Sequence, residues 1–255
     1  MKFYGLIGYP LDHSFSPGYF QQKWAGEGLS DCTYELYPLQ ELSDFQKWIS
    51  EQPMLKGLNV TRPYKQQIVP LLHALSPVAV RVGAVNTIRV EWKNKKPFLT
   101  GHNTDAIAFQ KTLEENGITQ RGKALILGTG GASLAVAHAL SELKIPYLSI
   151  SRQEGKGNRT YKKIDAPLLS ECTLIINCTP TGMFPDTGSK PEIPYDLLGT
   201  QHILYDLVYN PEETAFLKEG KKRGLFALNG MRMLHLQAEY AWKFWNEKTE
   251  QSTVL

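Results

Sequence analysis

The sequence predicts an α/β protein of two domains, because strand-like and helix-like segments alternate along its whole length. Apolar runs at 2–8, 32–39 and 56–60 are separated by segments with helical spacing, which is typical of a largely parallel sheet. In the second half, an apolar run at 123–127 leads into a glycine-rich turn and then a helix of small residues. The boundary between the halves is expected near 101–104.

Each further element follows from local signals. In the first half, Ser16 is expected to cap a helix with Pro17 in its first turn, and a hairpin is expected across 93–96. The other helices of that half are expected at 41–52 and 63–72. The second half is expected to contain helices at 104–116, 132–143, 211–223 and 230–247, and strands at 123–127, 147–151, 174–178, 202–207 and 226–228.

Composition excludes several classes of protein. The 255 residues are 42% hydrophobic, and a net charge of +3 is too weak and too scattered for nucleic acid or an anionic membrane. No run of 18 apolar residues is present. Three cysteines without a CxxC pair are typical of a reduced cytoplasmic protein. We therefore expect a cytoplasmic protein that binds neither nucleic acid nor membrane, and no metal site.

The glycine-rich turn at 128–133 predicts a dinucleotide site. Backbone N–H groups of such a turn approach a pyrophosphate at the positive end of the following helix, as in a Rossmann fold. The third glycine of the usual GxGxxG pattern is Ser133 here, so a simple glycine-rich connection is the alternative. The expected cofactor-binding residues are Gly128, Thr129, Gly130, Gly131 and Ala132.

The end of the next strand selects the cofactor. An acidic residue there would bind the ribose of NAD, whereas an arginine suits the 2′-phosphate of NADP. Ser151 and Arg152 stand at this position, which favours NADP. A solvated surface arginine is the alternative, and nearby Glu154 weakens the preference.

Polar residues also stand where strands of the first half end, the usual ligand edge of an open α/β sheet. Each has an ordinary structural explanation when taken singly, such as a helix cap, a core amide or a surface cation. These residues are Ser14, Ser16, Asn59, Thr61, Lys65, Asn86 and Asp105.

Together, seven ordered motifs resemble those of shikimate dehydrogenases. The resemblance covers the chain from the first strand to the last helix and implies NADP-dependent interconversion of 3-dehydroshikimate and shikimate, in chorismate and aromatic amino-acid biosynthesis. The motifs are His13-Ser14-Phe15-Ser16-Pro17, Asn59-Val60-Thr61-Arg62-Pro63-Tyr64-Lys65, Gly83-Ala84-Val85-Asn86-Thr87, Asn103-Thr104-Asp105, the turn at 128–133, Ile176-Asn177-Cys178-Thr179-Pro180-Thr181-Gly182-Met183 and Leu236-Gln237-Ala238.

The resemblance also implies roles for single residues. Lys65 and Asp105 match the catalytic pair, and Ser14 and Ser16 match serines that hold the substrate carboxylate. Other substrate-binding residues are expected to be Asn59, Thr61, Asn86, Tyr209 and Gln237, and the residues expected at the nicotinamide are Asn177, Thr179, Met183, Gly230 and Met233. The implied domains are 1–102 with 231–255 for substrate and 103–230 for NADP, so the last helix returns to the first domain.

The proposed chemistry of the pair is direct. As a hydride reaches a carbonyl carbon, negative charge grows on the oxygen, and a lysine ammonium stabilises that charge and supplies the proton. A nearby carboxylate orients the lysine and keeps it charged. The residues alone do not decide which member of the pair carries the transferred proton.

The sequence departs from the family pattern in the cofactor region. In this chain Ser151-Arg152-Gln153 replaces the usual Asn-Arg-Thr phosphate clamp. The glycines that follow predict a loop over 153–171. Lys156 or Arg159 in this loop is a candidate to bind the 2′-phosphate. Phe15 replaces a lysine that is frequent in the family, and Asn229 replaces an aspartate. The alternatives are a quinate or shikimate dehydrogenase with relaxed cofactor or substrate preference and a non-catalytic module of the same fold. The chain is expected to be a monomer or a homodimer.

Overall fold

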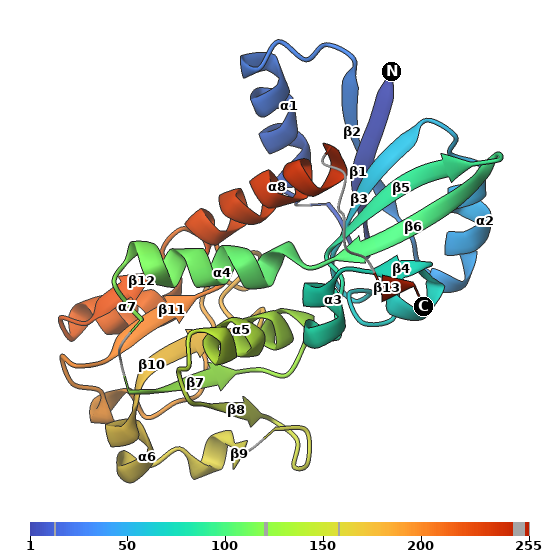
Figure 1. Ribbon diagram of the computed structural model, residues 1–255. Helices are drawn as coiled ribbons and strands as arrows, with labels where there is room; N and C mark the ends of the chain where they lie inside the picture. Colours follow the sequence, from blue (N-terminus) through green and yellow to red (C-terminus); the bar gives the residue numbers. More distant parts are fainter. Residues whose placement is uncertain (13, 120–121, 158, 247–252, 255) are drawn as a thin grey trace. The chain divides into compact units, whose positions relative to one another are not determined.

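The chain forms two compact units, each built on its own sheet (Figure 1). The computed structural model describes residues 1–12, 14–119, 122–157, 159–246 and 253–254. The first unit comprises Met1–Thr104 with Ala238–Leu255, and the second comprises Asp105–Gln237. The predicted α/β class is confirmed. The assignment of one unit to substrate and the other to NADP stays a prediction.

The sheet of the first unit brings several strand ends to one edge. β1 is parallel to both β2 and β3, whereas β5 is antiparallel to β3 and β6. The segments that follow β1, β3 and β6 and the segment that precedes β5 therefore lie at the same edge. In order across the sheet the strands are β13 (Thr253–Val254), β4 (Ala74–Leu75), β6 (Lys96–His102), β5 (Thr87–Lys93), β3 (Leu55–Val60), β1 (Lys2–Gly8) and β2 (Cys32–Pro38).

Two helix predictions for this unit need correction. The helix α1 (Ser16–Gly26) starts one residue early, so Ser16 is not its cap, and the Ser14 hydroxyl instead accepts a 3.4 Å bond from the Ser16 N–H. The helix expected over 63–72 is wrong: turns lead to a 3-10 segment, Val69–Leu71, because Pro70 has no N–H for a continuing helix. The other helical segments are Leu42–Asp44 (3-10), α2 (Phe45–Ser50) and α3 (Pro77–Val82).

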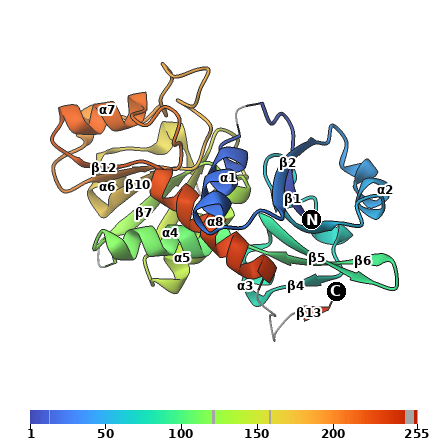
Figure 2. The same ribbon diagram turned by 90° about the horizontal axis from the view of Figure 1, so that it is seen from above.

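The sheet of the second unit is parallel throughout its described pairings. Figures 1 and 2 show α4 and α5 on one face and α6 and α7 on the other. The strand order is β12 (Phe226–Leu228), β11 (Ile203–Asp206), β10 (Cys172–Asn177), β7 (Lys123–Leu127), β8 (Tyr147–Ser151) and β9 (Arg159–Thr160). The helices are α4 (Thr104–Glu115), α5 (Gly131–Glu142), α6 (Ala166–Glu171) and α7 (Ala215–Lys222), with 3-10 segments at Tyr161–Lys163 and Tyr195–Leu197.

Two predictions for this unit were wrong in part. The helix α7 begins at Ala215 and not at Pro211, because the Thr214 hydroxyl caps it by accepting from the Leu217 N–H at 3.3 Å. The loop expected over 153–171 contains β9 and α6, whose cap is Asp165. The expected glycine-containing turn is present up to Gly157, and Asn158 lies outside the described residues.

The last helix, α8 (Met231–Asn246), packs its second half into the first unit, which confirms its expected return. Phe244 and Trp245 share a buried aromatic core with Tyr4, Phe20 and Trp24. Gly57 permits this packing, since a Cβ there would lie 2.5 Å from the Trp245 indole. The Lys23 ammonium, 2.7 Å from a Glu239 carboxylate oxygen, joins α1 to α8 at the surface.

Cys32, Cys172 and Cys178 all have free thiols. Within the described ranges, every helix is too short or too polar to cross a bilayer. The same residues contain no cluster of three or more His, Cys, Asp or Glu arranged to hold a metal ion.

Candidate active site

Buried hydrogen bonds connect the polar residues at the edge of the first sheet. The Ser16 hydroxyl is bonded to that of Tyr34, and burial raises the pKa of Tyr34 so that its phenol stays protonated. The Tyr34 hydroxyl donates to Asn59 Oδ1 at 2.7 Å, and Asn59 Nδ2 donates to the Asn86 carbonyl at 3.4 Å. Asn59 therefore connects the start of α1, through Tyr34 of β2, to the segment before β5.

Asn86 holds the start of α4. Its side chain is 2% exposed, and its Oδ1 accepts from the Thr104 N–H at 2.7 Å while its Nδ2 donates to the Thr104 hydroxyl at 2.8 Å. These bonds satisfy an N–H at the helix start that has no partner within the helix. Asn86 thus positions the turn that carries Asp105, and its expected contact with substrate stays a prediction.

The two residues expected to form the catalytic pair each adjoin this network. The Val85 N–H donates to the Lys65 carbonyl at 2.7 Å, which ties the backbone of Lys65 to the residue before Asn86. Asp105 directly follows Thr104, the residue that Asn86 binds, and is 6% exposed. The residues 85 and 86 therefore fix the backbone beside both members of the pair.

Ser14, Ser16 and Thr61 lie in the segments that leave β1 and β3. The Thr61 N–H donates to the Ile7 carbonyl at 2.9 Å, so the two segments start side by side. All three side chains are half-buried. Their hydroxyls suit a small anion or a hydroxylated ring, because a hydroxyl both donates and accepts.

The glycine-rich turn of the second unit leaves the backbone at the start of α5 open to an anion. Gly128 has φ of 112°, and a Cβ there would lie 3.1 Å from Thr179 Cγ2. A Cβ built on Gly130 would meet no described protein atom within 4 Å, and Gly130 gives α5 no side-chain cap. The N–H groups at the start of α5 therefore suit an anion that approaches the backbone closely.

Ser133 takes the place of the third glycine without disturbing the turn. Its hydroxyl donates to the Gly130 carbonyl at 2.6 Å, within the first turn of α5. Ser133 is 5% exposed, so it packs where a glycine would allow close contact between helix and sheet. The departure from the GxGxxG pattern is thus compatible with the phosphate-binding geometry.

At the end of β8, Ser151 is buried and Arg152 is exposed. Ser151 Oγ accepts from the Gln153 N–H at 3.1 Å, which shapes the turn that presents Arg152. The hydroxyl of Ser151, expected to donate to a phosphate, remains a candidate donor because this bond uses it only as an acceptor.

The loop after β10 is organised by Asn177, which is fully buried. Asn177 Oδ1 accepts from both the N–H and the hydroxyl of Thr179, at 3.0 and 2.6 Å. The Met183 N–H donates to the Pro180 carbonyl at 3.1 Å. Because Thr179 contacts the position of Gly128, this loop adjoins the glycine-rich turn.

Asp206, at the end of β11, is a functional candidate that the sequence analysis missed. Its Oδ1 accepts from Asn177 Nδ2 at 2.9 Å and from the Val208 N–H at 3.0 Å, and its Oδ2 accepts from the Thr214 hydroxyl at 2.6 Å. Its side chain is fully buried, and burial raises its pKa to about 6 although these bonds oppose the rise. One carboxylate thus joins the loops after β10 and β11 to the start of α7. Its place at a strand end was the available signal.

The start of α8 lies against the loop after β11. A Cβ at Gly230 would lie 2.1 Å from the Leu207 carbonyl oxygen, so only glycine fits, and the Gly230 N–H donates to the Val208 carbonyl at 3.2 Å. Tyr209, in the same loop, is half-buried. Further along α8, Met233 is buried, and Gln237 Nε2 donates to the Leu234 carbonyl at 2.9 Å. The expected ligand contacts of these residues stay predictions.

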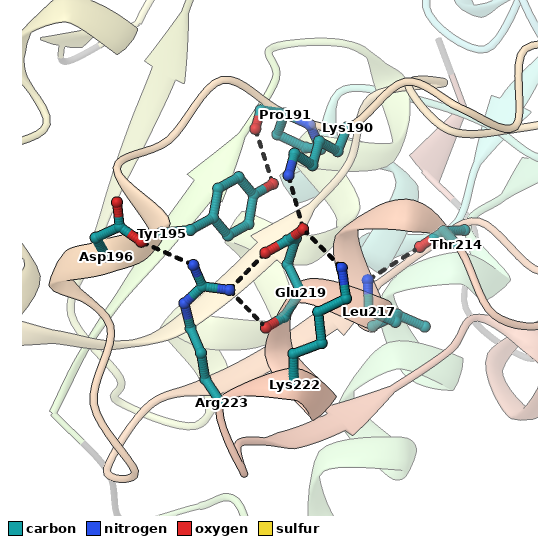
Figure 3. Close-up of polar contacts among 9 residues, drawn as sticks. All are labelled: Lys190, Pro191, Tyr195, Asp196, Thr214, Leu217, Glu219, Lys222 and Arg223. Atoms are coloured by element: carbon teal, nitrogen blue, oxygen red, sulfur yellow. Dashed lines mark hydrogen bonds and ion pairs between the residues drawn. The ribbon is translucent and has the colours of Figure 1, made fainter.

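An ion cluster on α7 anchors the segment that follows Met183 (Figure 3). Lys190 chiefly, and Arg223 in addition, hold the pKa of Glu219 at about 2. Arg223 also donates to Asp196 at 2.9 Å, and the Lys190 ammonium lies 4.7 Å from the centre of the Tyr195 ring. The cluster ties residues 190–196 to the helix that Thr214 caps.

The raised pKa of Asp206 predicts a pH-dependent stability. Its value is 3.8 in an unfolded chain and about 6 here, so between these values only the folded state keeps the proton. Stability from this carboxyl is therefore present below pH 4 and is lost as pH rises through 6. Relative to Asp206→Asn, wild type should lose on the order of 2 kcal/mol between pH 4 and pH 7 in urea unfolding. A constant difference would contradict this.

Comparison with known proteins gives one consistent result. A family model for the shikimate dehydrogenase substrate binding domain matches residues 6–88. The shikimate dehydrogenase (NADP(+)) of Syntrophomonas wolfei subsp. wolfei is 40% identical over 249 residues, covering 90% of this chain and 84% of the relative. That of Halothermothrix orenii is 36% identical over 265 residues, covering 94% and 89%.

Solved structures share the fold. The shikimate 5-dehydrogenase of Thermus thermophilus, in complex with NADP(H) and shikimate, superposes with a TM-score of 0.84 at 32% identity, covering 96% of this chain and 94% of that one. The quinate dehydrogenase of Corynebacterium glutamicum, in complex with NAD, gives 0.82 at 26% identity, covering 96% and 93%. The resemblance found in the sequence motifs is confirmed.

Proposed function

The chain belongs to the shikimate dehydrogenase family, and on that premise we propose that it reversibly reduces 3-dehydroshikimate to shikimate with NADPH. The observation that carries the proposal is the pair of Lys65 and Asp105, each beside the buried network of Asn86. In this reading the protein acts in the biosynthesis of chorismate and aromatic amino acids.

The glycine-rich turn and the loop after β10 fit NADP. The start of α5 lacks a side-chain cap, and the open position of Gly130 leaves room for a pyrophosphate against the backbone. Thr129, Gly131 and Ala132 would donate N–H groups there, and Met183, Gly230 and Met233 would line the nicotinamide. When bound, the reduced coenzyme supplies the hydride.

In the reaction, the chain's own residues would stabilise the developing negative charge and transfer a proton. The Lys65 ammonium would donate a hydrogen bond to the substrate carbonyl oxygen and transfer a proton as negative charge develops there. The Asp105 carboxylate would orient that ammonium. The backbone at Asp105 is held in place because Asn86 binds Thr104, the residue before it. In the oxidation of shikimate the same pair removes the hydroxyl proton.

Substrate recognition would come from neutral polar groups. Ser14 and Ser16 would bind the carboxylate, and Thr61 and Gln237 would bind the ring hydroxyls, with Tyr209 nearby. The Gln237 amide donates one N–H within its own helix, and this bond leaves its second N–H and its carbonyl oxygen for the substrate. Such groups select a hydroxylated ring because an analogue that lacks a hydroxyl leaves them unpaired.

Arg152 gives the preference for NADP a direct test. The Arg152→Leu variant should raise KM for NADP at least about tenfold, because a guanidinium forms two charge-assisted bonds to a phosphate. KM for NAD should change less than about twofold, since NAD has no 2′-phosphate. Initial rates with each coenzyme at saturating shikimate provide the measurement. Equal effects on both coenzymes would show that Arg152 does not bind the phosphate.

Assay of the purified chain tests the function itself. Shikimate and NADP should give reduced coenzyme, seen as absorbance of the dihydronicotinamide, and 3-dehydroshikimate with NADPH should consume it. Parallel assays replace shikimate with quinate and NADP with NAD, and we expect a lower rate after either replacement. The absence of turnover with every combination would reject the proposal. We further propose that the protein is cytoplasmic and is a monomer or homodimer, and sedimentation of the purified protein would decide its oligomeric state.

A further inference from the structure

The short strand β9 lies beside the end of β8, where the cofactor is selected. Ser151 pairs with Thr160, and Ile150 pairs with Arg159. Gly157 lies close against β8, since a Cβ on Gly157 would lie 3.0 Å from the Ser149 carbonyl and 3.1 Å from the Ser151 nitrogen. Thr160 is therefore held next to the residue that precedes Arg152.

The alternation of side chains along β9 separates Arg159 from Thr160. Ile150 belongs to the core that contains Leu168 of α6 and Phe216 of α7, so its partner Arg159 points toward that face. In agreement, Lys123 chiefly and Arg159 in addition lower the pKa of Glu171, at the end of α6. Thr160 points to the opposite face.

That opposite face is the one from which the dinucleotide would approach. The glycine-rich turn leads from β7 into α5, and α5 lies on the face away from α6 and α7 (Figures 1 and 2). The Thr160 hydroxyl does not cap the 3-10 segment that follows it, and the side chain is half-buried. It is thus a candidate donor on the side of the predicted pyrophosphate.

Arg152 directly follows Ser151, the strand partner of Thr160, at the carboxyl end of β8. The Gln153 N–H donates to Ser151 Oγ at 3.1 Å, so the chain turns at this point and exposes Arg152 beside that strand end. A hydroxyl and a cation at one strand end are the groups that bind a phosphate monoester.

We propose that Thr160 is a specificity-determining residue, whose hydroxyl donates to the 2′-phosphate of NADP together with Arg152. Gln153, in the turn between them, offers no hydroxyl. Arg159, a candidate from sequence, faces away and does not take part. The inference rests on the proposed use of NADP and adds a residue that would recognise its 2′-phosphate.

Kinetics of matched variants test this role. The Thr160→Val variant keeps the shape and removes the hydroxyl, and it should raise KM for NADP about tenfold, the contribution of one hydrogen bond to a charged group. Its KM for NAD and its kcat should not change. Thr160→Ser should restore the wild-type KM, and Arg159→Leu, the control on the same strand, should leave both KM values unchanged.

A binding experiment separates this inference from the proposed reaction. By calorimetry, wild type should bind adenosine 2′,5′-bisphosphate more tightly than adenosine 5′-monophosphate, and Thr160→Val should lose about tenfold of that preference. This result requires no turnover, so it would stand even if shikimate were not the substrate. An unchanged preference in Thr160→Val, or an equal loss for both nucleotides, would overturn the role of Thr160.

Discussion

Replacing Lys65 with alanine is expected to lower kcat for shikimate oxidation about 10³-fold, within the range that general acid–base catalysis contributes. The ammonium is needed where charge develops on the oxygen, so its loss acts on the transition state. KM for shikimate should change less than about threefold, because neutral groups bind the ground state. Steady-state rates at saturating NADP give both constants.

The exposed Lys56, on the neighbouring strand β3, provides a matched control. Lys56→Ala removes the same charge from the same unit and should leave kcat unchanged. If Lys65→Ala turned over like wild type, or if its whole effect appeared in KM, Lys65 would not be the proton donor.

Replacing Asp206 with alanine is expected to lower the free energy of unfolding by about 3–5 kcal/mol. The variant leaves Asn177 Nδ2, the Val208 N–H and the Thr214 hydroxyl without their buried acceptor. The loops that these groups fix include the predicted nicotinamide contacts, so KM for NADP should rise as well. Urea unfolding at pH 7 and coenzyme titration measure the two effects.

Two comparisons make the result specific. Asp206→Asn keeps the shape and can still accept from Asn177 while donating to Thr214, so it should lose much less stability than Asp206→Ala. The exposed Asp196 forms an ion pair with Arg223 of the α7 cluster, and Asp196→Ala should lower the free energy of unfolding by less than about 1 kcal/mol. If Asp206→Ala were no less stable than Asp196→Ala, the network would not hold the loops.

Short apolar runs between turn signals were sufficient to predict most strands of the second unit. The strands at 123–127, 147–151 and 226–228 have the predicted bounds, because their apolar runs are short and end at glycine, proline or polar residues. The helix after the glycine-rich turn was found for the same reason. In these segments local preference and tertiary packing favour the same structure.

The errors occur where a tertiary contact overrides a local signal. Pro63 indicated a helix start, but the Tyr64 hydroxyl donates to the carbonyls of Leu39 and Gln40, and Pro70 prevents a regular helix. Pro211 likewise indicated the start of α7, whereas the cap is Thr214, which Asp206 holds from another strand. Contacts between residues distant in sequence are not visible in local spacing.

The candidate site shows the same division. Single polar residues at strand ends were found because they interrupt apolar runs. The partners of these residues were not predicted. Asn86 binds Thr104 and Asp206 binds Asn177, and these contacts depend on how strands pair, which the linear sequence pattern does not specify. The pairing of Thr160 with Ser151 depends in the same way on β9, which was not predicted because Gly155 and Gly157 indicated a loop.

A crystal structure of the chain with both shikimate and NADP bound would test the central claim most directly. The Lys65 ammonium is expected to lie within hydrogen-bonding distance of both the Asp105 carboxylate and the shikimate hydroxyl that is oxidised. This expectation would be contradicted if, with both ligands in place, the two side chains were far apart and each pointed into solvent.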